Sequence, residues 1–479
     1  MCYGYDALNR IRHIRYGNGV ETAYTYDGDG NVRTLETRAG KTVLLSFAYR
    51  YDGNGNRTAK TGTQATLGGI ISGSNVLDIS YAYDVRGQLL EERRNGASVC
   101  YAYDKAENRI RKTDAQGEIR YLYNAKNQLI TEESPADRNQ FSYDRQGGII
   151  EEKNLAGIRL FSYNNRHQQT RVETETGNVQ ENRYDAEGLR FELLENGRRT
   201  SFVYHDGELL HEEGREEQGT SYHLGAGMEA FRRGQELSYY HRDEQLSTVF
   251  VTDGHRNVQN SYQYDAFGMS LGTTEKLNNR IRYTGQQYDD VTGQYYLRAR
   301  YYNPVAGRFM QEDVYQGDGL NLYAYCGNNP VVYDDPSGYA STSTGKACPP
   351  QGKISESVDE SGTASKGHTA TWELLDEHGN VIDSGVSTSG GTHPGRVLTW
   401  DEQLKTHTEY KILEDLKTDG KVSPNSTIVI IGTRPPCNPG RSMRPSRGCQ
   451  KAMQDFANAQ NVNILYFKEG DSNPWIFPR

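Results

Sequence analysis

The stretch SYAYDVRGQLLEERRNGASVCYAYD, residues 80–104, contains the pattern that decides the fold of most of this chain. Apolar and polar side chains alternate up to a Tyr-Asp pair, and the next Tyr-Asp pair follows 20 residues later. Alternation with a period of two predicts a strand, and an Asp followed by Gly or Asn two or three residues later predicts a tight turn. Each unit is therefore expected to form a strand, a turn and a second strand.

Tyr-Asp or Tyr-Asn pairs recur along the chain, and one such hairpin cannot bury its apolar face alone. We therefore expect the units to stack into one long sheet. A tyrosine that recurs in every unit is expected to be architectural, as part of a packed aromatic ladder with bonded hydroxyls, rather than part of one ligand site. The pairs begin at Tyr83, Tyr103, Tyr123, Tyr143, Tyr163 and Tyr184, with looser copies at Tyr5, Tyr26, Tyr51 and Tyr264.

These units resemble the YD repeats of Rhs proteins and of the related toxin-complex subunits. The resemblance is most specific at TGQYYLRARYYNPVAGRF (292–309) and NLYAYCGNNPVVYDDPSG (321–338). It implies an all-β sheet that spirals into a shell around a toxin. It also predicts a YD-repeat shell (1–290), an Rhs core terminus (291–338), a linker (339–368) and a toxin domain (369–479). Because about 338 residues is short for a closed shell, we expect a partial one.

The segment PVVYDDPSG, residues 330–338, fits the Rhs pattern PxxxxDPxG, after which members of the family cut themselves by aspartyl-protease-like chemistry. The resemblance implies that Asp335 and Asp313 are the two carboxylates and that Arg300 supports them. Such a pair can activate water and protonate the leaving amine when the two pKa values differ. Cleavage is expected at Gly338–Tyr339 or one bond later, although the family usually has Leu at the position of Tyr339. The alternative is a simple turn beside a structural ion pair.

After Gly338 the pattern of the sequence changes. A Ser-, Gly-, Thr- and Lys-rich stretch is followed by two predicted strands in 369–391 and an amphipathic helix in 398–418. An apolar strand (426–432), a second helix (448–460) and a further strand (461–467) complete the order. This order predicts a three-layer α/β domain.

Three pieces of this second domain carry residues with metal and acid–base chemistry. His407 and Glu409 lie in the first predicted helix, Cys437 follows the apolar strand, and Cys449 opens the second helix. One His and two Cys can bind a zinc ion (Zn²⁺) and leave a fourth position for water, while a nearby glutamate moves protons. The arrangement resembles the H-x-E and P-C…C signature of cytidine-deaminase-like toxins. Deaminases commonly have C-x-x-C, whereas eleven residues separate these two cysteines. The alternative is a buried pair of free cysteines beside a surface His-Thr-Glu.

The loop between the two cysteines is basic and has no acidic residue. Arginines near a reactive centre commonly bind phosphate, so we expect this loop to bind nucleic acid. A solvated basic loop, or a surface for an acidic immunity protein, remains the alternative. The net charge of −9 belongs mainly to the repeats, because residues 340–479 contain 15 Lys/Arg and 16 Asp/Glu. The arginines expected to bind phosphate are Arg441, Arg444 and Arg447 in the loop and Arg434 just before Cys437.

Together these patterns predict a secreted interbacterial Rhs effector that acts in the cytoplasm of a target bacterium. Its C-terminal domain is expected to be a zinc-dependent hydrolase that deaminates cytosine, in single-stranded DNA first and in RNA second. The resemblance also implies a cognate immunity protein and a secretion spike of the type VI kind. No apolar run is long enough to cross a membrane. A metal-dependent nuclease toxin and a non-enzymatic surface-binding protein remain as alternatives.

Overall fold

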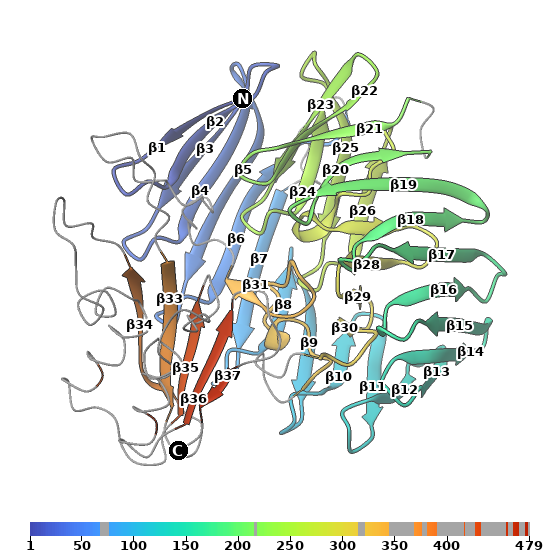
Figure 1. Cartoon of the computed structure of the whole chain (residues 1–479). Helices are drawn as coiled ribbons and strands as arrows, with labels where there is room; N and C mark the ends of the chain where they lie inside the picture. The colour runs from blue at the N-terminus through green and yellow to red at the C-terminus, as the bar shows by residue number, and fades with distance from the viewer. Residues whose placement is uncertain are drawn as a thin grey trace, which may run out of the picture. The chain divides into compact units, whose positions relative to one another are not determined.

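In a computed structural model of the chain, 26 strands form one antiparallel sheet in which each strand pairs with its neighbours in sequence (Figure 1). The structure describes residues 1–67, 76–214, 218–314, 321–343, 368–375, 381–389, 427–432, 463–468 and 475–477, together with Leu416 and Ala457. The chain divides into two compact units, Met1–Pro350 and Gln351–Arg479. The large sheet belongs to the first.

The strands of the large sheet are mostly five to eight residues long, as expected for a repeat of about 20 residues that contains two of them. They are β1 (Cys2–Tyr5), β2 (Ile11–Arg15), β3 (Val20–Tyr26), β4 (Val32–Ala39), β5 (Thr42–Tyr51), β6 (Arg57–Gln64), β7 (Val76–Tyr83), β8 (Leu89–Arg94), β9 (Ala97–Tyr103), β10 (Arg109–Asp114), β11 (Gly117–Tyr123), β12 (Leu129–Glu133), β13 (Arg138–Tyr143), β14 (Ile149–Asn154), β15 (Gly157–Tyr163), β16 (Gln169–Glu173), β17 (Val179–Tyr184), β18 (Arg190–Glu195), β19 (Arg198–His205), β20 (Glu208–Glu213), β21 (Thr220–Leu224), β22 (Met228–Arg233), β23 (Glu236–Arg242), β24 (Thr248–Thr252), β25 (Val258–Tyr264) and β26 (Ser270–Glu275).

In the repeats after the first, the tyrosine of the Tyr-Asp or Tyr-Asn pair is the last residue of its strand, and its hydroxyl donates to a backbone carbonyl of the preceding strand. Tyr143, at the end of β13, donates to the carbonyl of Leu129, the first residue of β12, over 3.0 Å. Burial raises the pKa of Tyr143 to about 12, which keeps the phenol neutral and able to donate. These bonds confirm the architectural interpretation of the tyrosines. The same bond is made by Tyr26, Tyr51, Tyr83, Tyr103, Tyr123, Tyr163, Tyr184 and Tyr264.

The Asp or Asn that follows each tyrosine closes the turn. Asp104 Oδ1 accepts the backbone N–H groups of Ala106 and Asn108, each over 2.9 Å, in the local arrangement that Asp and Asn side chains favour. The third residue after the Asp or Asn adopts a positive φ, such as 83° at Gly87 and 60° at Asn127. Gly and Asn tolerate this conformation best, which explains their place in the repeat.

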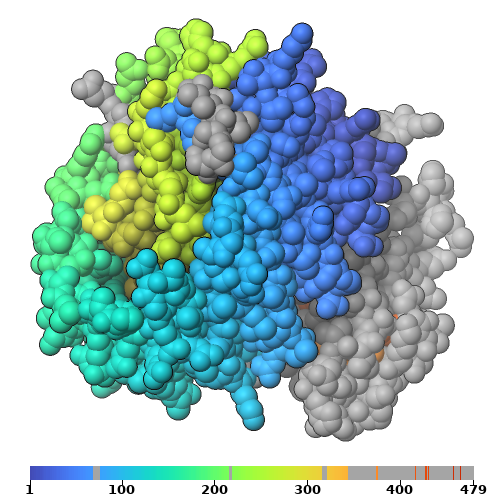
Figure 2. Space-filling model, turned by 180° about the vertical axis from the view of Figure 1, so that it is seen from behind, coloured from blue at the N-terminus to red at the C-terminus, as the bar shows by residue number. Residues whose placement is uncertain are grey.

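The strand pairing shifts by one residue at the tyrosine of most repeats. A β-bulge lies between Ser142 and Tyr143, and equivalent bulges precede Tyr123 and Tyr163. Bulges bend a strand and increase its twist. Because the bulge recurs along the sheet, the bend accumulates, and the sheet curls until strands from its two ends meet (Figure 2).

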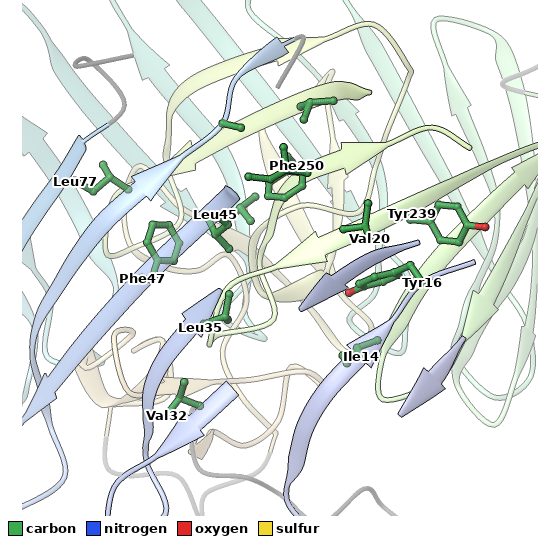
Figure 3. Packing of buried hydrophobic residues seen from close by; sticks show 14 of the residues in the cluster. Ile14, Tyr16, Val20, Val32, Leu35, Leu45, Phe47, Leu77, Tyr239 and Phe250 are labelled. Carbon is green, nitrogen blue, oxygen red and sulfur yellow. The ribbon is translucent and has the colours of Figure 1, made fainter. Parts of the chain in front are cut away.

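Strands from the two ends of the sheet share one apolar cluster. Val20, Leu45 and Phe47 of the N-terminal strands pack with Tyr239 and Phe250 of β23 and β24 (Figure 3). Polar contacts join the same strands, because the Gln64 amide donates to the carbonyls of both Val249 and Tyr262 over 2.8 Å. Since both ends are held by buried contacts, the curvature of the sheet is fixed.

The rest of the first unit packs on the face of the sheet that carries Tyr121, Phe141 and Phe161. Tyr296 and Tyr301 of this segment join those rings in one buried cluster. Its elements are the 3₁₀ helix η3 (Tyr283–Gly285), a four-stranded sheet of β27 (Gln287–Asp289), β28 (Gln294–Leu297), β29 (Arg300–Asn303) and β30 (Arg308–Phe309), the 3₁₀ helix η4 (Cys326–Asn328), and the strand pair β31 (Tyr333–Asp334) and β32 (Thr342–Ser343).

The second unit contains a five-stranded sheet in the order β34-β33-β35-β36-β37, in which β35 and β36 are parallel. The two N-terminal strands, the apolar strand and the strand after the second predicted helix were all expected from the sequence, whereas β37 was not. Leu416 and Ala457, one in each predicted helix, are helical and buried. The strands are β33 (His368–Leu375), β34 (Val381–Ser389), β35 (Thr427–Gly432), β36 (Asn463–Lys468) and β37 (Trp475–Phe477). Across the described ranges, no helix combines the length and hydropathy needed to cross a membrane.

Replacing Tyr143 by Phe removes a partly buried hydroxyl while keeping the ring. We expect the free energy of unfolding to fall by about 1 kcal/mol, because the part-buried hydrogen bond to Leu129 is lost. Urea unfolding followed by circular dichroism measures the change. The matched control is Tyr5→Phe, at the same repeat position in β1 but with an exposed side chain. Equal losses in the two variants would contradict the proposed role of the hydroxyl.

Candidate functional site

Three residues predicted from the sequence lie in contact, and one of them, Arg300, begins β29. Arg300 Nη2 lies 2.7 Å from Asp313 Oδ2 and 3.3 Å from Asp335 Oδ2, and all three side chains are buried. One guanidinium nitrogen thus contacts both carboxylates. The sequence predicted two carboxylates that share a proton, and the structure places a permanent positive charge in contact with each of them.

The remaining nitrogens of Arg300 bind backbone carbonyls. Nε donates to the carbonyl of Gly338 over 2.5 Å and Nη1 to that of Leu322 over 3.1 Å. The guanidinium also lies over the ring of Phe309, 3.5 Å from its centroid. These contacts fix the plane of the guanidinium, so it holds the Gly338 carbonyl in one orientation.

Three consecutive carbonyls at the end of the DPSG segment are held by three consecutive residues. The carbonyl of Pro336 accepts from Arg298 Nη1 over 2.9 Å, and that of Ser337 accepts from the Ala299 N–H over 3.2 Å. The third is the Gly338 carbonyl on Arg300. The backbone that precedes the Gly338–Tyr339 bond is therefore clamped along its length. Arg298 was not predicted as part of the site. The available signal was the Arg-Ala-Arg sequence at 298–300, which places Arg298 two residues before the predicted Arg300.

The second oxygen of Asp335 faces the other side of the same peptide bond. Oδ1 accepts the backbone N–H of Gly338 over 2.8 Å and those of Ser337 and Tyr339 over 3.2 Å. Burial raises the pKa of Asp335, while Arg300 and these donors act in the opposite direction. The carboxyl therefore lies beside the amide nitrogen of Tyr339 with an increased tendency to carry a proton.

Gly338 is the residue that allows this close approach. Its φ is +74°, and a Cβ built on it would lie 2.4 Å from the carbonyl oxygen of Leu297 and 2.9 Å from the backbone nitrogen of Arg300. Both atoms belong to backbone and cannot move aside cheaply. The glycine of the DPxG pattern is thus required by the contact with β29 as well as by the turn.

A third carboxyl lies next to Asp335. Asp334, in β31, is buried, and its Oδ1 accepts the hydroxyl of Thr342 over 2.8 Å. The pKa of Asp334 is raised to about 6, mainly by burial and in addition by the charge of Asp335, while the Thr342 bond opposes the shift. Neither Asp334 nor Thr342 was predicted as part of the site. The adjacent Asp-Asp in the sequence was the available signal.

The residues predicted for the second domain's chemistry lie outside the described residues. They are His407, Glu409, Cys437, Cys449, Arg434, Arg441, Arg444 and Arg447.

Profile comparison identifies the family of the first unit. The profile described as Teneurin YD-shell matches residues 69–331, more than half of the chain. The chain belongs to the teneurin YD-shell family. The RHS Repeat profile matches residues 5–43 of the same YD-shell. The expected YD-repeat architecture is thus confirmed.

Curated relatives resemble parts of this YD-shell chain. The tRNA nuclease WapA of Bacillus subtilis (strain 168) is 31% identical over 352 residues, which is 70% of this chain and 12% of the relative. The Double-stranded DNA deaminase toxin A of Burkholderia cenocepacia (strain H111) is 32% identical over 119 residues, 24% of this chain and 8% of the relative. A solved TcdB2-TccC3-Cdc42 structure is 17% identical, with a TM-score of 0.38 over 70% of this chain and 21% of that one. The YD-shell chain therefore spans a small part of the length of these proteins.

Replacing Gly338 by Ala places a methyl group against two backbone atoms of the YD-shell. We expect a loss of about 1 kcal/mol from the positive φ and a further loss of about 1–3 kcal/mol from the contact with Leu297 and Arg300. Gly177→Ala is the matched control, because its φ is +80° and nothing lies within 4 Å of its added Cβ. Urea unfolding of both variants measures the difference. Similar losses at the two glycines would show that the clamp does not exclude a side chain.

Proposed function

We propose that the chain cleaves its own backbone between Gly338 and Tyr339 and so releases its C-terminal unit from the YD-shell. The observation that carries this proposal is that both ends of one peptide bond are held by ionisable side chains. Arg300 Nε donates to the Gly338 carbonyl, and Asp335 Oδ1 accepts the Tyr339 N–H.

The chemistry follows from those positions. Water attacks the carbonyl carbon of Gly338, and Arg300 stabilises the negative charge that develops on its oxygen. Asp313, held on the same guanidinium, takes the proton of the water. The carboxyl of Asp335 delivers a proton to the nitrogen of Tyr339, a role favoured by its raised pKa. The carbon–nitrogen bond breaks and leaves a carboxylate on Gly338 and a free amine on Tyr339.

For the released domain, the proposed activity is zinc-dependent deamination of cytosine in a nucleic acid. The donor set of His407, Cys437 and Cys449 suits a zinc ion with one open position, which would supply a Lewis acid and an activated water. Glu409 would move one proton of the attacking water to the ring nitrogen and the second to the departing amine, which leaves as ammonia. The likeness to a toxin named as a deaminase supports this activity. Single-stranded DNA is the favoured substrate and RNA the second, with Arg434 and the three arginines of the inter-cysteine loop binding phosphate.

A nuclease is the second candidate, and the likeness to WapA, named as a tRNA nuclease, favours it. In that case His407 and Glu409 serve a metal-dependent phosphodiester cleavage. In either case the chain acts as a secreted Rhs toxin delivered into the cytoplasm of a target bacterium. A cognate immunity protein and a secretion spike are its proposed partners. A non-enzymatic surface-binding role is the remaining alternative.

Replacing Asp335 or Asp313 by Asn tests the self-cleavage. We expect the purified wild-type protein to contain a fragment that begins at Tyr339, and each variant to remain one 479-residue chain, with cleavage slowed at least about 100-fold because a proton-transfer group is lost. Intact-mass spectrometry and N-terminal sequencing measure this. Asp185→Asn is the control, because Asn already occupies the same turn position at Asn124 and Asn164. Cleavage of the Asp335→Asn variant at the wild-type rate would refute the mechanism.

Replacing Glu409 by Gln tests the released activity. Residues 339–479 are produced as part of the full chain and incubated with single-stranded DNA, with RNA, and with duplex DNA. We expect uracil and ammonia without strand breaks from the wild type, and a loss of at least about 100-fold in the variant, because general acid–base catalysis is removed. Glu402→Gln is the control, since Glu402 lies outside the H-x-E pattern. Strand breaks without uracil would favour the nuclease instead.

A further inference from the structure

The loop that contains the Gly338–Tyr339 bond is closed at its base by a short strand pair. β31 and β32 are antiparallel, with Tyr333 opposite Ser343 and Asp334 opposite Thr342. The loop between them, residues 335–341, therefore has the bond near its centre. The residues on both sides of the bond are held by the YD-shell, but by different groups.

On the side before the bond, residues 298–300 clamp three successive carbonyls. On the side after the bond, Thr342 supplies the anchor. Its hydroxyl lies 2.8 Å from Asp334 Oδ1 and 3.4 Å from the carbonyl oxygen of Asp334. The side chain of Asp334 is thus the acceptor that ties β32, on the product side, to β31, which directly precedes Asp335.

We infer that Asp334 and Thr342 are positioning residues for self-cleavage, which hold residues 339–343 so that the nitrogen of Tyr339 stays on Asp335. This inference rests on the proposed self-cleavage. The bond between Tyr339 N and Asp335 Oδ1 is 3.2 Å long, at the weak end of hydrogen bonding. A small displacement of the loop would therefore lose it. Holding a reacting group within a few tenths of an ångström of its partner is a recognised source of rate enhancement.

The surroundings of Asp334 suit this role. The residue is 5% exposed, and Asp335 is the charged neighbour that affects it most. With a pKa of about 6, Asp334 is mainly ionised at pH 7.5 and accepts the Thr342 hydroxyl as a charged group. Hydrogen bonds to an ionised acceptor are shorter and roughly twice as strong as neutral ones. The hydrogen bonds described for Asp334 join it to Thr342 and not to the Gly338–Tyr339 bond. Its effect on cleavage therefore passes through the β31–β32 strand pair.

The experiment follows cleavage of the full chain during cell-free synthesis at pH 7.5, with a pulse of labelled amino acid and a chase. Thr342→Val removes the hydroxyl and keeps the branched shape. We expect it to slow the appearance of the two fragments about tenfold, the effect of losing one hydrogen bond of this kind. Thr342→Ser restores the hydroxyl and is expected to cleave within about twofold of the wild type. Thr170→Val is the matched control, because its hydroxyl bonds Ser162 on the exposed face of the sheet.

A double-mutant comparison separates a specific pair from general loosening. Asp334→Ala alone is expected to slow cleavage to a similar degree, and the Asp334→Ala/Thr342→Val double variant no further, because both changes remove the same bond. Multiplied effects would overturn the proposal, as would slow cleavage of Thr342→Ser. Resistance of the uncleaved chain to added protease reports folding in each variant.

Two further outcomes distinguish this inference from the proposal beneath it. If the wild-type chain does not cleave, or if Asp335→Asn cleaves normally, the self-cleavage itself fails. If the wild type cleaves and Asp335→Asn does not, but Thr342→Val cleaves at the wild-type rate, only the positioning role fails.

Discussion

The hydrogen bond from the tyrosine of each repeat after the first to the first carbonyl of the preceding strand is the interaction on which the first unit depends. It occurs where the tyrosine ends its strand at a β-bulge, so one residue marks the end of pairing and the place where the strand bends. The Asp or Asn that follows closes the turn because its side-chain oxygen accepts two backbone N–H groups. One dipeptide therefore sets the strand length, the turn and the curvature, and its repetition makes the curvature cumulative.

Cumulative curvature brings distant parts of the chain together, and buried charge then fixes their positions. Arg57 and Lys60 of β6 pair with Glu244 and Asp243, which precede β24. Arg190 of β18 pairs with Asp289 of β27, and both side chains are fully buried. Breaking a buried pair leaves an uncompensated charge at a cost of about 3–5 kcal/mol. These pairs therefore favour one position of β6 against β24 and one position of β27 against β18. Because β27 leads through β28 to β29, that placement also positions Arg300.

The repeat pattern of the sequence was sufficient to predict the strands, the turns and the role of the tyrosines, because those features are determined by neighbouring residues. Arg300, Asp313 and Asp335 were reached through a family pattern, and the structure brings them together. Arg298, Asp334 and Thr342 carry no local signature, since their partners depend on where β29 and β31 lie in space. The packing of the two ends of the sheet could not be predicted from a local pattern either. Gln64 and Val249, for example, are hydrogen-bonded but lie 185 residues apart in the sequence. Strand β32 pairs back onto β31 and so belongs to the first compact unit, Met1–Pro350.

The same dependence on distant contacts bears on when the proposed cleavage can occur. Arg300 and Gly338 belong to the segment that packs on the face of the sheet formed by β11 to β16, and Asp289 of the same segment pairs with Arg190 of β18. Residues 330–338 alone contain the scissile sequence but neither Arg300 nor Asp313. A newly made chain would therefore carry an inert DPSG turn until the shell segment had folded. Cleavage would then follow folding of the shell as a consequence of geometry, without a separate control element.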